Sequence, residues 1–203
     1  RQRQMCIRDS PNLYKETIDM MMRMQPQVKK LIFIADELYT NRYLDKLIHS
    51  YILAKYPTLA YEWLVGNNQN ADYLQEYLVS RDLSIGLLFS SWFYERESVH
   101  GFPMLISGDT RMISASPHPV FALRSAYLQD GVLGGYFPDG DQVRKALTSL
   151  VVKMLEGESM RDIPFIYSTK SYPIVNYSQL SQDRLAVERC PEGTKFIDKP
   201  KTL

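Results

Sequence analysis

The sequence has few of the residues that build metal sites and disulfide frameworks. Its 203 residues include two cysteines, Cys6 and Cys190, so one disulfide is the most it can form, and cysteine content does not indicate a redox compartment. The three histidines, His49, His100 and His118, are far apart, and no two have the spacing of zinc ligands. We therefore expect no metal site and no cofactor.

An excess of charge of one sign is also missing. The chain has 24 basic and 23 acidic residues, a net charge of +1, which gives no reason to expect a nucleic-acid-binding surface. No segment approaches the roughly 18 consecutive apolar residues of a membrane span, and the N-terminus lacks the apolar core of a signal peptide. If the domain is exported, we expect its targeting segment outside this sequence.

The first nine residues do not read as part of a fold. The stretch RQRQMCIRDS has no apolar periodicity and resembles translated adaptor sequence at the end of an assembled gene. We therefore expect residues 1–9 to be a non-native tail, which would leave Cys190 as a lone thiol.

From residue 10 onward, apolar runs typical of buried strands alternate with stripes typical of helices. Ser10-Pro11 is a helix start, and Thr40 or Asn41 can cap a later helix. Strands are expected near 30–36, 58–65, 84–90, 119–123, 131–137 and 164–168, and helices near 11–25, after 40, after 70 and over 139–156. Residues 94–116 are expected to be mostly loop, and the proline-containing tail mostly irregular. This order predicts an α/β fold with a doubly wound, mostly parallel sheet.

Ligands of open α/β sheets bind beyond the carboxyl ends of the strands, so the residues that follow each strand are the candidate site. We expect a small-molecule ligand to be held on one concave face there. The predicted ligand-binding residues are Tyr39, Thr40, Ser90, Ser91, Trp92, Arg124 and Tyr136.

Two kinds of catalysis were considered for these strand ends. Asp36-Glu37 after an apolar strand is a feature of phospho-acceptor receiver domains, but the third strand ends in Ser90 where such a domain has aspartate. A capping role of Asp36 on loop amides is therefore preferred. A serine nucleophile at Ser90 or Ser91 lacks the flanking glycines of a hydrolase elbow. No catalytic residue is predicted.

Three further features each have two interpretations. The Trp92-Phe93-Tyr94 cluster is either a stacking platform for a ligand or packing of the loop onto its own lobe. The glycines of GVLGG (131–135) either cradle phosphate or allow a tight crossing of the chain between lobes, and the crossing is preferred. Arg124 either clamps an anionic ligand group or pairs with Asp130 or Asp109.

Taken in order, these segments resemble a known family. The runs LIFIADELYTNR, LLFSSWFYER, PVFAL, GVLGGYF, MLEGE, DIPFIY, YPIVNYSQL and PEGTKFIDKP look like the extracytoplasmic sensor domains of bacterial membrane-bound histidine kinases, including hybrid two-component systems. These domains are similar to ABC-transporter substrate-binding proteins and have the type I periplasmic-binding fold. The resemblance covers nearly all of residues 10–203.

The resemblance implies two lobes with a ligand between them, of which this chain is a C-terminal part. Residues 10–26 and 129–160 would be first-lobe remnants, 27–128 the second lobe, and 161–203 a return to the second lobe and a tail. The implied function is non-catalytic sensing of a small molecule for a membrane kinase, with a transporter's binding protein as the alternative and a doubly wound enzyme as a third class. The domain would be periplasmic or extracytoplasmic, attached to the membrane only through segments outside this sequence, with a possible homodimer in the parent receptor.

In the family, the helix near 11–25 and the helix near 139–156 belong to the first lobe. We therefore expect both helices and the 131–137 strand to sit together away from the main sheet, with much of their apolar surface exposed.

Overall fold

The structure is a computed structural model, and it describes residues 13–65, 82–97, 103–107, 113, 116–159 and 170–200. The predicted helix start at Ser10-Pro11, the helix after residue 70 and the strand near 164–168 lie outside these described residues.

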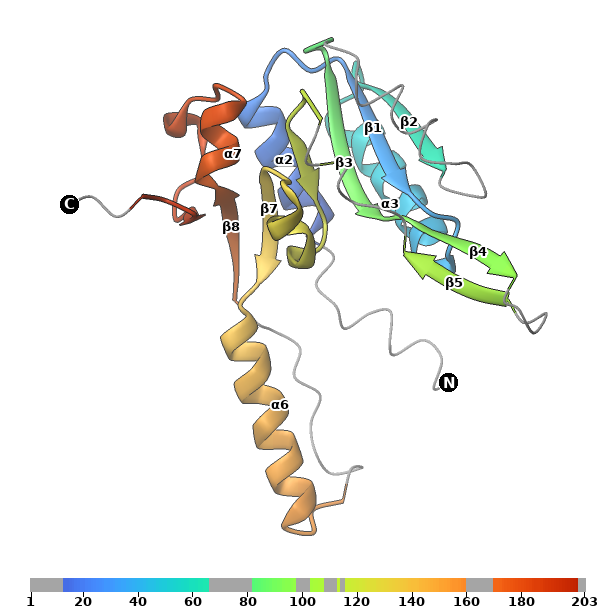
Figure 1. The fold of residues 1–203 in the computed structure, drawn as a ribbon, viewed down its shortest axis with the longest axis vertical. Helices are drawn as coiled ribbons and strands as arrows, with labels where there is room; N and C mark the ends of the chain where they lie inside the picture. The colour runs from blue at the N-terminus through green and yellow to red at the C-terminus, as the bar shows by residue number, and fades with distance from the viewer. Residues whose placement is uncertain are drawn as a thin grey trace.

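A seven-stranded sheet with the order β2-β1-β3-β6-β7-β8-β9 forms the body of the molecule (Figure 1). Its strands are β1 (Lys30–Ala35), β2 (Ala60–Val65), β3 (Ile85–Ser91), β6 (Val120–Ala122), β7 (Gly134–Pro138), β8 (Ser171–Asn176) and β9 (Lys195–Ile197). All neighbouring strands are parallel except β7 and β8. The predicted α/β class with a mostly parallel sheet is confirmed.

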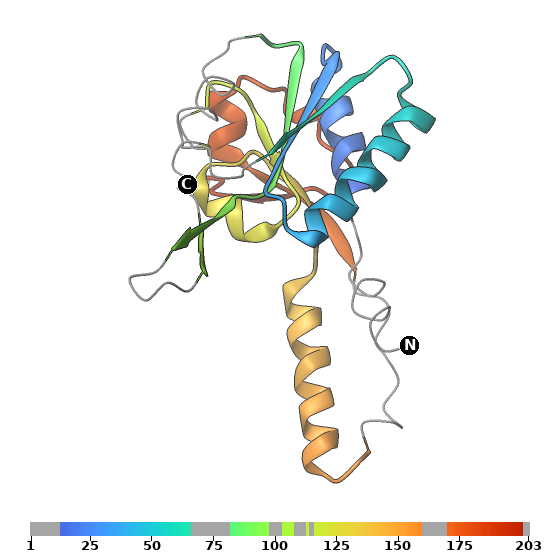
Figure 2. The same ribbon diagram turned by 90° about the vertical axis from the view of Figure 1, so that its right-hand side faces the viewer.

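β1 lies between β2 and β3 in the sheet. Its apolar run is typical of a strand that is covered on both faces. Side chains alternate along a strand, so Leu31 and Phe33 point to one face and Ile32 and Ile34 to the other, and all four are fully buried. The first face is covered by α2 (Tyr14–Met24) and α3 (Tyr39–Lys55), which lie side by side in Figure 2. The 3₁₀ helix η2 (Ser125–Asp130) packs on the second face.

The caps of two helices can be compared with the sequence patterns. Asp139 caps α6 (Gly140–Leu155) by accepting from the N–H groups of Asp141 and Gln142, and Gly157 follows it in the left-handed region at φ 92°. Both features agree with the expected helix. The expected cap of α3 at Thr40 or Asn41 is wrong, because the helix begins at Tyr39 and Asn41 is buried within its first turn.

The expectation that α2, β7 and α6 sit together away from the main sheet is wrong for α2 and β7. β7 is a member of the main sheet. Ile18, Met21 and Met24 of α2 are fully buried on the first face of this sheet. The apolar stripe of α2 packs against β6 and β7. The expectation holds for α6 alone, which projects from the body and has no buried residue; Leu147 is 57% and Leu155 83% exposed (Figure 2).

Regular structure also occurs where loops were predicted. β4 (Phe93–Glu97) and β5 (Pro103–Ser107) form an antiparallel hairpin separate from the main sheet. After residue 170 the chain forms β8, α7 (Tyr177–Gln182), the 3₁₀ helix η3 (Val187–Arg189) and β9 instead of an irregular tail. No helix in the described part of the chain is long and apolar enough to cross a bilayer.

Candidate ligand site at the carboxyl edge of the sheet

The candidate site is the edge at which β1, β3, β6 and β7 end, called here the carboxyl edge. Because these strands are parallel, the residues that follow each of them meet at this edge. Asp36 to Thr40 follow β1, Trp92 follows β3 and Arg124 lies just beyond β6. The hairpin β4–β5 and helix α6 both leave the body from this edge (Figure 1).

A buried hydrogen-bond network, here called the Asp36 network, joins Asp36, Asn41, Ser90 and Ser91. Asp36 Oδ1 accepts from the Leu38 N–H (3.0 Å) and from Asn41 Nδ2 (2.7 Å). Its Oδ2 accepts from Ser91 Oγ (2.8 Å) and from the Phe93 N–H (3.1 Å). Asn41 also donates to Ser91 Oγ (2.9 Å) and accepts from Ser90 Oγ (2.8 Å). The preferred capping role of Asp36 on loop amides is therefore confirmed.

A β-bulge lets both serines enter this network. Ile34 of β1 pairs with Phe89 of β3, but the next residue, Ala35, pairs with Ser91, so Ser90 is the extra residue. Successive strand residues normally point to opposite faces, and the extra residue turns both hydroxyls toward Asn41 and Asp36. Both serines are at most 2% exposed, so they lie inside the carboxyl edge rather than on its surface.

Trp92 and Tyr136 lie on opposite faces of the sheet. Trp92 is 7% exposed and packs into the apolar cluster of the second face, which agrees with loop packing rather than an open stacking platform. Tyr136 packs against the cluster of the first face, and its N–H donates to Thr17 Oγ1 of α2 (3.0 Å). These two side chains therefore do not share one face of the sheet.

Three of the predicted residues are exposed at the carboxyl edge. Tyr39 is 70% exposed, and Thr40 and Arg124 are also exposed. Tyr39 and Thr40 are the first two residues of α3, where backbone N–H groups have no partner within the helix. Within the described residues Arg124 forms no ion pair; Asp130 is among them, whereas Asp109 lies outside. Because Arg124 is exposed, its side chain is accessible from solvent.

The sequence patterns did not single out Tyr127 of η2, which belongs to the same edge. Its half-buried ring packs edge-on against Phe89, with 4.7 Å between ring centroids. Burial raises the pKa of Tyr127, the Arg124 charge lowers it, and the negative charges of Asp36 and Asp130 raise it further. The Tyr127 N–H donates to the Arg124 carbonyl (3.4 Å), so the two residues lie side by side at this edge. Its position three residues after Arg124 was the available signal.

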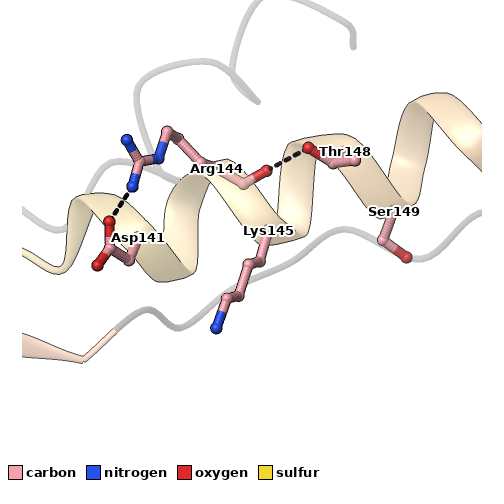
Figure 3. A pocket seen from close by; sticks show the side chains of 5 residues that line it. All are labelled: Asp141, Arg144, Lys145, Thr148 and Ser149. Carbon is pink, nitrogen blue, oxygen red and sulfur yellow. Dashed lines mark hydrogen bonds and ion pairs between the residues drawn. The ribbon is translucent and has the colours of Figure 1, made fainter.

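Two surface hollows lie elsewhere. One of about 640 Å³ runs along exposed α6 and is lined by Asp141, Arg144, Lys145, Thr148 and Ser149 (Figure 3). Its lining comes from one helix, and Arg144 already forms an ion pair with Asp141. Another of about 510 Å³ is lined by residues that include Ser116 and Asp183. Among the described residues no group of three or more metal-ligating side chains is placed to hold an ion.

Comparison with solved structures places this arrangement among known folds. A substrate-binding protein with adhesive properties from Clostridium difficile, in its ligand-free open form, superposes with a TM-score of 0.60 at 14% identity, over 92% of this chain and 60% of that one. An ABC domain in complex with L-Trp from Streptococcus pneumoniae gives 0.61 at 13% identity, over 92% and 62%. A conserved domain protein from Vibrio cholerae gives 0.61 at 12%, over 90% and 59%.

The chain has a periplasmic-binding-protein-like fold. It spans about 60% of the length of these solved structures. No protein-family model matches the sequence, and no curated protein does.

Proposed function

We propose that the chain binds a small molecule at the carboxyl edge, with Tyr39, Thr40, Arg124 and Tyr127 as contacts. The observation that carries this proposal is that exposed aromatic and polar groups gather where the parallel strands end. The fold supports it, because one protein of the same fold is described in complex with L-Trp. Ser90, Ser91, Trp92 and Tyr136 act behind this surface through packing and hydrogen bonds.

We further propose that the chain is a binding module without catalysis. The Ser90 hydroxyl donates to the Asn41 amide oxygen, which is not a base. The Ser91 hydroxyl donates to the Asp36 carboxylate, but Ser91 is fully buried, so a substrate in solution does not reach it. Hydrolase turnover that disappears in Ser90→Ala would overturn this proposal.

The parent protein is proposed to be a membrane-bound sensor kinase, on the basis of the resemblance of the strand and helix motifs. A transporter's binding protein is the second candidate, favoured by the neighbour described as a substrate-binding protein. Both place the domain outside the cytoplasm. The coding sequence beyond Leu203 separates them: a membrane span followed by a kinase supports the sensor, and a stop codon supports the transporter component.

α6 is proposed to pack against a further lobe of the complete protein. Leu147, Val151 and Met154 are each about half exposed, and a stripe of this width normally faces a sheet. The solved neighbours are longer than this chain, which is consistent with additional structure that covers the helix.

A ligand screen on the complete protein tests the proposed site. Thermal shift with amino acids, sugars and nucleobases is expected to yield a stabilising compound. Arg124→Ala should remove most of that stabilisation, whereas Arg144→Ala, an exposed arginine on α6, should leave it unchanged. Full stabilisation in both Arg124→Ala and Tyr39→Ala would contradict the proposed contacts.

A further inference from the structure

Asp36 is a buried carboxylate that connects separate parts of the carboxyl edge. It is 1% exposed, and its two oxygens accept four hydrogen bonds. Its donors come from the first turn of α3 and the residue before it, from the end of β3, and from the start of β4. Loss of a partner from a buried polar group is costly, so these four hydrogen bonds hold the junction together.

Asp36 contacts both of the segments that it joins, and Asn41 of the first turn of α3 adds hydrogen bonds to Ser90 and Ser91 at the end of β3. Tyr39 and Thr40 open α3, and the hairpin β4–β5 pairs with itself and not with the main sheet. At its base, the hairpin is tied to β1 by the Asp36 N–H donating to the Ser91 carbonyl (3.0 Å) and by the Phe93 N–H donating to Asp36 Oδ2 (3.1 Å).

We infer that Asp36 is a positioning residue, which holds the first turn of α3 and the base of the hairpin as one unit at the candidate site. The bulge at Ser90 belongs to this device, because it brings both serine hydroxyls into the network. The inference refines the proposed function, but the contacts that carry it do not depend on a ligand.

Asp36→Asn is the sharpest perturbation. In either orientation the new amide NH₂ faces a backbone N–H, that of Leu38 or that of Phe93, so one donor loses its acceptor. Asp19→Asn is the matched control. Asp19 also accepts several hydrogen bonds, from Tyr51, Tyr56 and Lys55, but these residues lie toward the other end of α3.

Amide hydrogen exchange reports the local effect through groups that do not bond to Asp36. Exchange at Arg42 in the first turn of α3, and in the β4–β5 hairpin apart from Phe93, is expected to rise at least tenfold in Asp36→Asn relative to exchange in β1. In Asp19→Asn this ratio should not change. A residue with a purely global stabilising role would accelerate exchange in all elements alike.

Trp92 gives a second reading at the base of the hairpin. The chain has two tryptophans, so Trp63→Phe leaves Trp92 as the sole source of tryptophan fluorescence. Acrylamide quenching of Trp92 should at least double in Asp36→Asn and stay constant in Asp19→Asn. If Asp36→Asn does not fold, Ser91→Ala, which removes one donor to the carboxylate, should show the same changes at smaller amplitude.

Unchanged local exchange and quenching in the Asp36 or Ser91 variants, or equal changes in Asp19→Asn, would overturn the inference. Because no ligand enters these measurements, their failure is distinguishable from failure of the proposed site in the ligand screen.

Discussion

The glycine pair in β7 allows a quantitative prediction, because the structure shows what a larger side chain would meet. A Cβ on Gly134 would lie 2.2 Å from the backbone oxygen of Ile174 in β8, and one on Gly135 would lie 2.3 Å from that of Ala122 in β6. Neither glycine has a positive φ, so close strand approach rather than backbone conformation requires them. A crossing of the chain between lobes is therefore not what requires these two glycines, because both lie within one sheet.

Gly134→Ala is therefore expected to destabilise the protein strongly. Overpacking a core costs about 1–3 kcal/mol, and here the obstacle is backbone that cannot change rotamer, so we expect about 3 kcal/mol or more. For a chain of this size that corresponds to a Tm lower by about 6–12 °C. Gly140→Ala is the control: nothing lies within 4 Å of its Cβ position at the start of α6, so stability should change by no more than about 0.5 kcal/mol.

Urea unfolding monitored by circular dichroism measures both variants under the same conditions. A Gly134→Ala protein within about 0.5 kcal/mol of the parent would refute the reasoning. So would a Gly140→Ala protein that loses as much stability as Gly134→Ala.

The remaining predictions concern two carboxylates and one apolar stripe. Burial raises the pKa of Asp183 to about 6, so this group lowers the stability of the fold as pH rises from about 4 to 6. Asp183→Asn should abolish that decline and raise the free energy of unfolding at pH 7 by about 1–2 kcal/mol, which a series of Tm measurements against pH would show. Burial raises the pKa of Asp19, but hydrogen bonds from Lys55, Tyr51 and Tyr56 outweigh it and lower the pKa, so Asp19 stabilises the fold above about pH 4 and loses this effect in acid. Asp19→Asn should therefore lower the free energy of unfolding by about 1 kcal/mol at pH 7 and leave it unchanged near about pH 2, as measured by urea unfolding. Leu147→Glu on exposed α6 should leave the Tm of this chain unchanged and reduce its self-association, measured by light scattering. A Tm loss above about 4 °C would show that the apolar stripe of α6 is already packed against other residues.

Sequence patterns predicted the parts of the fold whose signals are local. The run over β1 is apolar without interruption, and its burial on both faces follows directly. Asp139 and Gly157 mark the ends of α6 by cap chemistry that depends on neighbouring residues alone.

Features that depend on distant partners were missed. Pro173 indicated an irregular segment, because proline has no N–H to donate within a sheet. It nevertheless lies in β8, just before Ile174, the first residue of that strand that pairs with β9. α2 was assigned to a separate lobe on the family resemblance, but its apolar stripe packs against β6 and β7 of the main sheet.

The candidate site shows the same division between local and distant information. The strand-end rule located Tyr39, Thr40 and Arg124 at one edge. It placed Ser90 and Ser91 on the surface because no pattern in the sequence reveals the bulge that turns both inward. Tyr127 was missed because its contact with Phe89 depends on how η2 packs over β3.

The most direct test of ligand binding at the carboxyl edge is hydrogen exchange of the complete protein with and without the compound that stabilises it in the thermal-shift screen. The account predicts that added compound slows exchange in residues 36–42 and 123–128, with little change around Ser116 and residues 179–184. Protection confined to that second region, or protection absent from both segments of the carboxyl edge, would contradict it.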